Sequence, residues 1–171
     1  MTLRETVSLL TFPGVIIHEL GHKLFCDFMN VKVKEVKYFR LGDPAGYVIH
    51  DAPRNFKQSF FITVGPFIFG TLLSIIFFIY SKFYAGNLLA EILFFWLGIS
   101  SAARCFPSYS DAKVLWKETN RHIKRNFFAI IGYPFVLLIW IVNWLDVIWI
   151  EFLYALFLYV IVNHYIFHAF L

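Results

Sequence analysis

The sequence predicts an all-α polytopic membrane protein with about five transmembrane helices and a small β-hairpin-like element between helices 1 and 2. Hydrophobic residues make up 60% of the 171-residue chain and charged residues only 15%, whereas soluble domains contain about 45–50% and about 25%. The mean hydropathy is +0.68. Apolar stretches near the length that crosses a bilayer, about 20 residues, alternate with charged gaps. This composition excludes a disordered chain and a disulfide scaffold.

Five apolar segments are expected to span the bilayer. They cover residues 6–29, 60–80, 88–103, 127–145 and 147–171. Almost no loop separates the last two, so they are expected to form a helical hairpin. Because no linker or internal repeat interrupts the chain, we expect a single domain over residues 1–171. Its core helices would lie at about 6–116 and the accessory hairpin at about 127–171.

The gap between the first two segments has the pattern of a short β-hairpin. Apolar and basic residues alternate over 31–34, turn-forming residues occupy 42–46, and an apolar run follows at 47–50. An isolated pair of strands is marginally stable, so this one should lean on the helices. An exposed edge would suit an unwound substrate segment that adds as a further strand. The alternative is a solvated basic loop that only sets the orientation of the chain.

Basic residues are concentrated in two gaps that share one side of the membrane if each segment spans once. The first gap carries Lys32, Lys34, Lys37, Arg40, Arg54 and Lys57, and the second carries Arg104, Lys113, Lys117, Arg121, Lys124 and Arg125. Cytoplasmic loops are enriched in Lys and Arg, so both gaps are assigned to the cytoplasm. The basic residues of these two gaps also explain the isoelectric point near 9.1. The expected partner is therefore the lipid bilayer and not a nucleic acid. Cys26 and Cys105 would lie near this reducing side and are expected to be free thiols.

One motif in the first segment indicates chemistry. Residues 18–22 read His-Glu-Leu-Gly-His, which places two imidazoles one helical turn apart on one face. Two such imidazoles can share a zinc ion, and the neighbouring glutamate can take a proton from an attacking water. Ionisable groups inside a membrane segment are costly and indicate function; the alternative is a polar patch paired by hydrogen bonds. His18 and His22 are therefore candidate zinc ligands, and Glu19 is the candidate general base.

A catalytic zinc ion needs a third protein ligand and an open position. The sequence offers ten candidates, namely Asp27, His50, Glu91, Asp111, Glu118, His122, Asp146, Glu151, His164 and His168. Glu91, Asp146 and Glu151 are expected toward the far side of the membrane. Asp111 directly follows the third segment near the cytoplasmic face, where a carboxylate can point inward. The alternative is that Asp111 only caps a helix that begins near Ala112.

These residues resemble the site-2-protease-like family of intramembrane zinc metalloproteases, particularly its compact prokaryotic and archaeal members. The resemblance runs from about residue 12 to about residue 116. It rests on the histidine motif, on Gly65-Pro66 in the second segment and on Asp111 after the third. It implies that the two histidines of the motif and Asp111 bind one Zn²⁺ per chain, and that Glu19 is the general base.

The sequence therefore predicts an intramembrane zinc metalloendopeptidase whose substrate is a membrane protein, cleaved in a membrane-embedded or membrane-proximal segment. The chain is expected to be a multi-pass membrane protein with its active site toward the cytoplasmic face. Two alternatives stay open. One is a membrane metallopeptidase whose third ligand is Glu118 or Glu151. The other is a non-catalytic membrane protein that binds zinc and regulates a partner.

Overall fold

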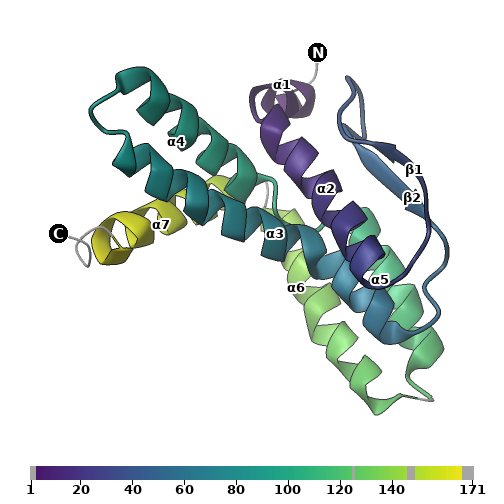
Figure 1. Cartoon of the computed structure of the whole chain (residues 1–171). Helices are drawn as coiled ribbons and strands as arrows, with labels where there is room; N and C mark the ends of the chain where they lie inside the picture. Colours follow the sequence, from purple (N-terminus) through teal and green to yellow (C-terminus); the bar gives the residue numbers. More distant parts are fainter. Residues whose placement is uncertain (1–2, 125, 146–148, 167–171) are drawn as a thin grey trace.

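The computed structural model describes residues 3–124, 126–145 and 149–166. Most of these residues are helical, and two strands form one small sheet (Figure 1). In chain order the elements are α1 (Leu3–Leu10), α2 (Phe12–Phe28), β1 (Val33–Lys37), β2 (Tyr47–His50), α3 (Phe56–Phe83), α4 (Leu88–Ala103), α5 (Tyr109–His122), the 3₁₀-helix η1 (Phe127–Ile131), α6 (Gly132–Leu145), α7 (Ile150–Ile161) and the π-helix η3 (Val162–Ile166). The mostly helical class and the hairpin are thus confirmed.

The first predicted segment forms two helices instead of one. Pro13 has no backbone N–H, and its ring would collide with the carbonyl of residue 9 in a continuous helix. Proline is tolerated in the first turn of a helix, and Pro13 lies in the first turn of α2. Thr11 closes α1, because its backbone N–H and its hydroxyl both donate to the Val7 carbonyl, at 2.9 and 2.7 Å. The result is a 17-residue α2 that carries the whole His-Glu-Leu-Gly-His motif.

The hairpin packs beside α2. Its strands are antiparallel, with Val36 opposite Val48. Val31, just before β1, is buried with Cys26 of α2 and Ile62 of α3. Two isolated strands are marginally stable, and this contact supplies the support that the sequence analysis required. It also fixes β2 beside the motif (Figure 1).

The central element is α3, which begins four residues before the predicted segment because Asn55 caps it and accepts a hydrogen bond from the Gln58 backbone N–H (2.9 Å). One apolar core forms around Phe56, between α3, α5 and α6. A second forms around Phe78, between α3, α4 and α7. The two cores divide the helices between the two halves of α3 (Figure 1), and α2 packs across α3 and α4. Both cysteines are buried and free, as predicted.

The prediction of five membrane-crossing helices is wrong for the part of the chain that the structure describes. Two helices are long and apolar enough to cross a membrane, namely α3 and the helix Phe127–Leu145 that η1 and α6 form together. The apolar helices Leu88–Ala103 and Ile150–Tyr165 are shorter, and the first segment is interrupted by the proline described above. The predicted junction of the last two segments at Asp146 and the end of the last segment lie outside the described residues.

Candidate metal centre and active site

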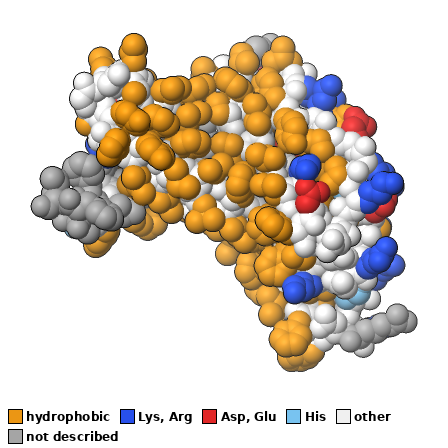
Figure 2. Space-filling view, in the orientation of Figure 1, with side chains coloured by type: hydrophobic (Ala, Val, Ile, Leu, Met, Phe, Trp, Pro, Cys, Tyr) orange, Lys and Arg blue, Asp and Glu red, His pale blue; other side chains and the backbone are white. Residues whose placement is uncertain are grey.

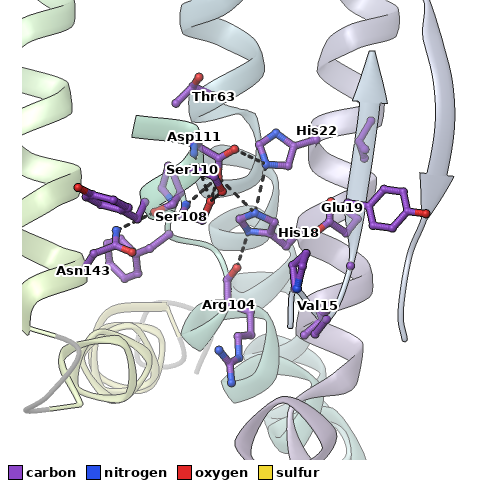
Figure 3. A pocket seen from close by; sticks show the side chains of 18 of the residues that line it. Val15, His18, Glu19, His22, Thr63, Arg104, Ser108, Ser110, Asp111 and Asn143 are labelled. Carbon is purple, nitrogen blue, oxygen red and sulfur yellow. Dashed lines mark hydrogen bonds and ion pairs between the residues drawn. The ribbon is translucent and has the colours of Figure 1, made fainter. Parts of the chain in front are cut away.

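The motif on α2 opens onto a cleft of about 1450 Å³. The cleft is lined by α2, by β2 and the segment before it, and by the turn from α4 into α5. Trp140 and Asn143 of α6 and Glu151 of α7 complete its wall, a contribution of the accessory helices that the sequence analysis did not predict. His18 and His22 project from one face of α2 toward α5 (Figure 3), as their spacing predicted.

Each imidazole of the motif is oriented by a backbone carbonyl. His18 Nδ1 donates to the Arg104 carbonyl (2.8 Å), and His22 Nδ1 donates to the Ile62 carbonyl (2.9 Å). Arg104 is the C-cap residue of α4, and the last carbonyls of a helix have no partner within it. In a neutral imidazole with its proton on Nδ1, Nε2 carries a free lone pair. Each neutral ring would thus present Nε2 to a cation, and the two Nε2 atoms lie only 3.2 Å apart.

Asp111 belongs to the first turn of α5 and takes part in its cap. Its Oδ2 accepts hydrogen bonds from the Ser108 N–H and hydroxyl, both at 2.7 Å, and its own N–H donates to that hydroxyl (3.3 Å). This reciprocal pair is a capping box. The expected helix start near Ala112 is wrong, because α5 begins at Tyr109 with Ser108 as the N-cap. Capping and pointing inward are therefore compatible for Asp111.

The Asp111 carboxylate faces the two histidines. Oδ1 lies 3.5 Å from His22 Nε2, and Oδ2 lies 4.0 Å from His18 Nε2. Burial alone would raise the pKa of the Asp111 carboxyl, but His22, His18 and the Ser108 hydrogen bonds together hold that pKa well below its ordinary value. The carboxylate is consequently ionised at neutral pH.

These three side chains fit a zinc ion. Their ligand atoms lie within 4.8 Å of one another. Among the described residues, no other three His, Cys, Asp or Glu side chains come together in this way. Ligands placed about 2.0–2.1 Å from zinc at tetrahedral angles are about 3.3 Å apart. The separations of 3.2 Å between the two Nε2 atoms and 3.5 Å between His22 Nε2 and Asp111 Oδ1 are close to that value. Two neutral imidazoles and one carboxylate also leave a fourth position open.

Glu19 lies beside His18 in the wall of the cleft, between α2 and the segment that leads into β2 (Figure 3). Its side chain is only 8% exposed. A Cβ placed on Gly46 would lie 2.7 Å from Glu19 Cγ and 3.0 Å from Oε1, so only glycine allows the chain to pass this close. The hairpin therefore covers the carboxylate directly and restricts where it can point.

Three of the other acidic candidate ligands lie close to basic side chains and not to the two histidines of the motif. Asp27 forms an ion pair with the lysine one turn earlier on α2, at 2.6 Å. Glu118 is buried on α5 beside His122, whose Nδ1 lies 3.4 Å from its carboxylate. The expectation that Glu151 lies on the far side from the motif is wrong, because Glu151 lines the same cleft and lies 4.0 Å from Arg104 Nη1. None of these side chains joins the three ligand atoms described above.

The remaining candidates divide between the cleft and more distant sites. His50 lines the cleft, and its Nδ1 donates to the Asp51 carbonyl (2.8 Å). Glu91 belongs to the first turn of α4, the end away from the motif, and His164 belongs to η3. Asp146 and His168 lie outside the described residues.

Three features of the site were not predicted from the sequence, namely the two carbonyls that orient the histidines and the glycine that covers Glu19. Backbone acceptors have no residue type of their own, so motif spacing cannot reveal them. The available signals are a helix end, which frees the Arg104 carbonyl, and a proline four residues ahead, which frees that of Ile62. For Gly46, the turn composition of 42–46 indicated a loop but not what the loop would contact.

Comparison with known protein families finds a match over most of the chain. A family model with the description "Putative zincin peptidase" (DUF3267) matches residues 11–123, a range that holds the α2 motif and Asp111 and ends before the accessory helices. No curated protein and no solved structure matches the chain. Zincins are zinc peptidases that carry His-Glu-x-x-His, so the expected zinc metallopeptidase family is confirmed at this level. The chain belongs to the zincin peptidase family that this model describes.

Proposed function

We propose that this protein is an intramembrane zinc metalloendopeptidase, with one zinc ion held by His18, His22 and Asp111 and with Glu19 as the general base. One observation carries the proposal: two Nε2 atoms, whose rings already donate from Nδ1 to backbone carbonyls, converge with a carboxylate at separations of 3.2 and 3.5 Å. Two neutral imidazoles and a carboxylate placed this close would repel one another, and a shared cation offsets that repulsion. Structural zinc sites have four protein ligands, so three ligands beside a glutamate favour catalysis.

The metal ligands and the residues around them would supply the groups that peptide hydrolysis needs: a Lewis acid, a general base and acceptors that orient the ligands. Zinc, when bound, is a Lewis acid that polarises the scissile carbonyl and lowers the pKa of the attacking water. Glu19 accepts the proton from that water and then donates it to the leaving amine. The Arg104 and Ile62 carbonyls keep the imidazoles in the tautomer that presents Nε2.

The substrate is proposed to bind as an extended segment along β2. Peptide bonds inside a helix are protected by their own hydrogen bonds, so a transmembrane substrate must unwind before it is cut. β1 occupies one edge of β2, and β2 lines the cleft that holds the metal centre. Addition of an unwound strand to the other edge would satisfy its backbone hydrogen bonds next to Glu19.

The intramembrane setting is supported by apolar surface that the protein does not bury. Only 39% of the apolar window of α3, and 22% of that of Phe127–Leu145, is buried inside the protein. Figure 2 shows hydrophobic side chains over most of one face and charged side chains gathered on the side of the hairpin. A bilayer accommodates such a face, whereas a large apolar patch on a soluble monomer is unusual. By the positive-inside rule, the basic hairpin assigns the active site to the cytoplasmic side.

Metal content tests the proposal. Detergent-purified wild-type protein is expected to contain about one zinc per chain, measured by elemental analysis after dialysis against zinc-free buffer. His22→Ala and Asp111→Ala should lose most of it. Asp27→Ala is the matched control, because this carboxylate lies on the same helix but is paired with Lys23; it should keep its zinc.

Other outcomes would change the proposal in defined ways. Zinc lost in His22→Ala but kept in Asp111→Ala would remove Asp111 as third ligand and direct attention to Glu151, which lines the same cleft. Absence of zinc from the wild type, even after zinc is supplied, would contradict the metal centre. Stoichiometric zinc without cleavage of any unfolded or transmembrane substrate would favour a non-catalytic zinc protein.

A further inference from the structure

A proline interrupts the hydrogen bonding of α3 at the point where this helix faces the motif. Pro66 lies inside the 28-residue α3. Because proline has no N–H, the carbonyl four residues earlier, at Ile62, lacks the donor that a regular helix would supply. Ile62 is only 4% exposed, and a buried carbonyl without a donor is unfavourable. The sequence of α3 therefore creates an acceptor that needs a partner from another element.

His22 is that partner. Its Nδ1 lies 2.9 Å from the Ile62 oxygen. The two helices approach closely because Gly21 lies directly against the proline: a Cβ on Gly21 would be 2.7 Å from Pro66 Cα and 3.1 Å from Pro66 N. Pro66 therefore has two effects: it frees the Ile62 carbonyl, and it forms the surface that Gly21, the residue before His22, packs against.

We propose that Pro66 is a positioning residue of the metal centre: by removing one hydrogen bond from α3, it provides the backbone acceptor that orients His22 to bind zinc through Nε2. His18 receives an equivalent acceptor from the end of α4, at Arg104. Both imidazoles are therefore held by carbonyls that a helix leaves free, one at an interruption and one at a terminus. This inference rests on the proposed zinc site and requires no peptidase activity.

A proline inside a helix can also serve only to shape the helix, and the missing N–H distinguishes the two roles. Pro66→Ala restores an N–H that competes with His22 for the Ile62 carbonyl. A second variant carries lactic acid at position 66, which joins through an ester: it has the side chain of alanine, no proline ring and no N–H. If shape alone matters, the two variants should behave alike. If the acceptor matters, only Pro66→Ala should be impaired.

Zinc affinity, measured by competition with a chelator, is the first readout. Loss of a partner that orients a metal-binding histidine typically weakens metal affinity by about 10- to 100-fold, and this is the effect expected for Pro66→Ala. The ester variant is expected to bind zinc nearly as tightly as the wild type. Pro134→Ala is the matched control, since Pro134 is an exposed proline in α6 that does not line the cleft; its zinc affinity should not change.

The tautomer of His22 is the second readout and needs neither zinc nor activity. Nitrogen NMR of the zinc-free wild type, with labelled histidine, is expected to show the proton of His22 on Nδ1, and Pro66→Ala should shift that population toward Nε2. Wild-type zinc affinity in Pro66→Ala, weak binding by a folded ester variant, or a wild-type His22 protonated on Nε2 would each overturn the inference. If Pro66→Ala does not fold, the ester variant and the wild-type tautomer decide the question. Absence of zinc binding by the wild type would instead refute the proposed metal centre.

Discussion

At the scale of single residues, Glu19 is the group on which the proposed chemistry depends most directly. It lies beside the three ligand atoms without being one of them. Glu19→Gln is expected to lower the cleavage rate by about 10²–10⁴-fold, the usual contribution of a general base, while zinc content stays unchanged. Single-turnover cleavage of a purified transmembrane reporter, with elemental analysis of the same sample, measures both. A variant that cuts at the wild-type rate would rule out this role for Glu19.

Gly46 allows a second test at this scale, because it constrains Glu19 without contacting the metal ligands. A methyl group there would come within 2.7 Å of Glu19 Cγ and 3.0 Å of the Tyr38 carbonyl. Displacing a catalytic group by about 1 Å can cost about 10²-fold in rate, so Gly46→Ala should cut substrate about 10- to 100-fold more slowly and keep its zinc. Gly86→Ala serves as the control, since no atom lies within 4 Å of its added carbon. Equal rates for the two variants would contradict the restraint on Glu19.

The residues that could be predicted from the sequence are those whose spacing encodes their geometry. His18 and His22 share a face because a helix repeats every 3.6 residues, and the structure brings them together (Figure 3). Asp111, distant in the chain, was favoured by its position after the third segment and selected by resemblance, not by spacing. The carbonyls of Ile62 and Arg104 could not be selected at all, because tertiary packing determines which free carbonyl meets which imidazole.

At the scale of elements, the cap of α5 is part of the metal centre. Ser108 donates two hydrogen bonds to Asp111 Oδ2 and thereby sets the direction of Oδ1. Ser108→Ala removes the hydroxyl and should lower the free energy of unfolding by about 1 kcal/mol, as for other N-caps. It should also weaken zinc binding, because the carboxylate loses one of the bonds that orient it.

Asn87 provides the matched control for this prediction. It caps α4 in the same manner, by accepting a hydrogen bond from the Ala90 N–H (3.3 Å), but at the end of α4 away from the motif. Asn87→Ala should cost a similar free energy of unfolding without any change in zinc affinity. Denaturant unfolding in detergent and chelator competition measure the two quantities. Equal zinc affinities in the two variants would show that the cap only stabilises the helix.

Elements were predicted well where apolar composition and helix boundaries coincide. The range 88–103 was predicted with the bounds of α4, since Asn87 and the residues after Ala103 mark both ends. The prediction of one segment over 6–29 was wrong because Pro13 hardly changes the mean hydropathy of the segment but interrupts the helix. The hairpin was found because strand alternation and turn residues occur together in the gap.

At the scale of the whole molecule, polar segments lie at the two ends of the apolar helix α3. The hairpin precedes its N-terminus and carries basic residues such as Lys34 and Lys37, and the turn at 84–87 follows its C-terminus. At 1.5 Å per residue, a helix of 28 residues is about 42 Å long, more than the hydrocarbon core of a bilayer, which is about 30 Å thick. If α3 crosses the membrane, its two ends must therefore emerge on opposite sides.

Thiol labelling of intact cells tests this arrangement with one cysteine at each end of α3. Lys37 on β1 and Ala85 in the turn after α3 are both exposed, so Lys37→Cys and Ala85→Cys should react readily with a membrane-impermeant maleimide that can reach them. Because the hairpin is proposed to be cytoplasmic, Ala85→Cys should be labelled in intact cells and Lys37→Cys only after permeabilisation. The unsubstituted protein is the control, since Cys26 and Cys105 are buried. The reverse pattern would invert the orientation and place the active site on the outer side, and labelling of both positions in intact cells would show that α3 does not cross the membrane, which would remove the basis for intramembrane cleavage.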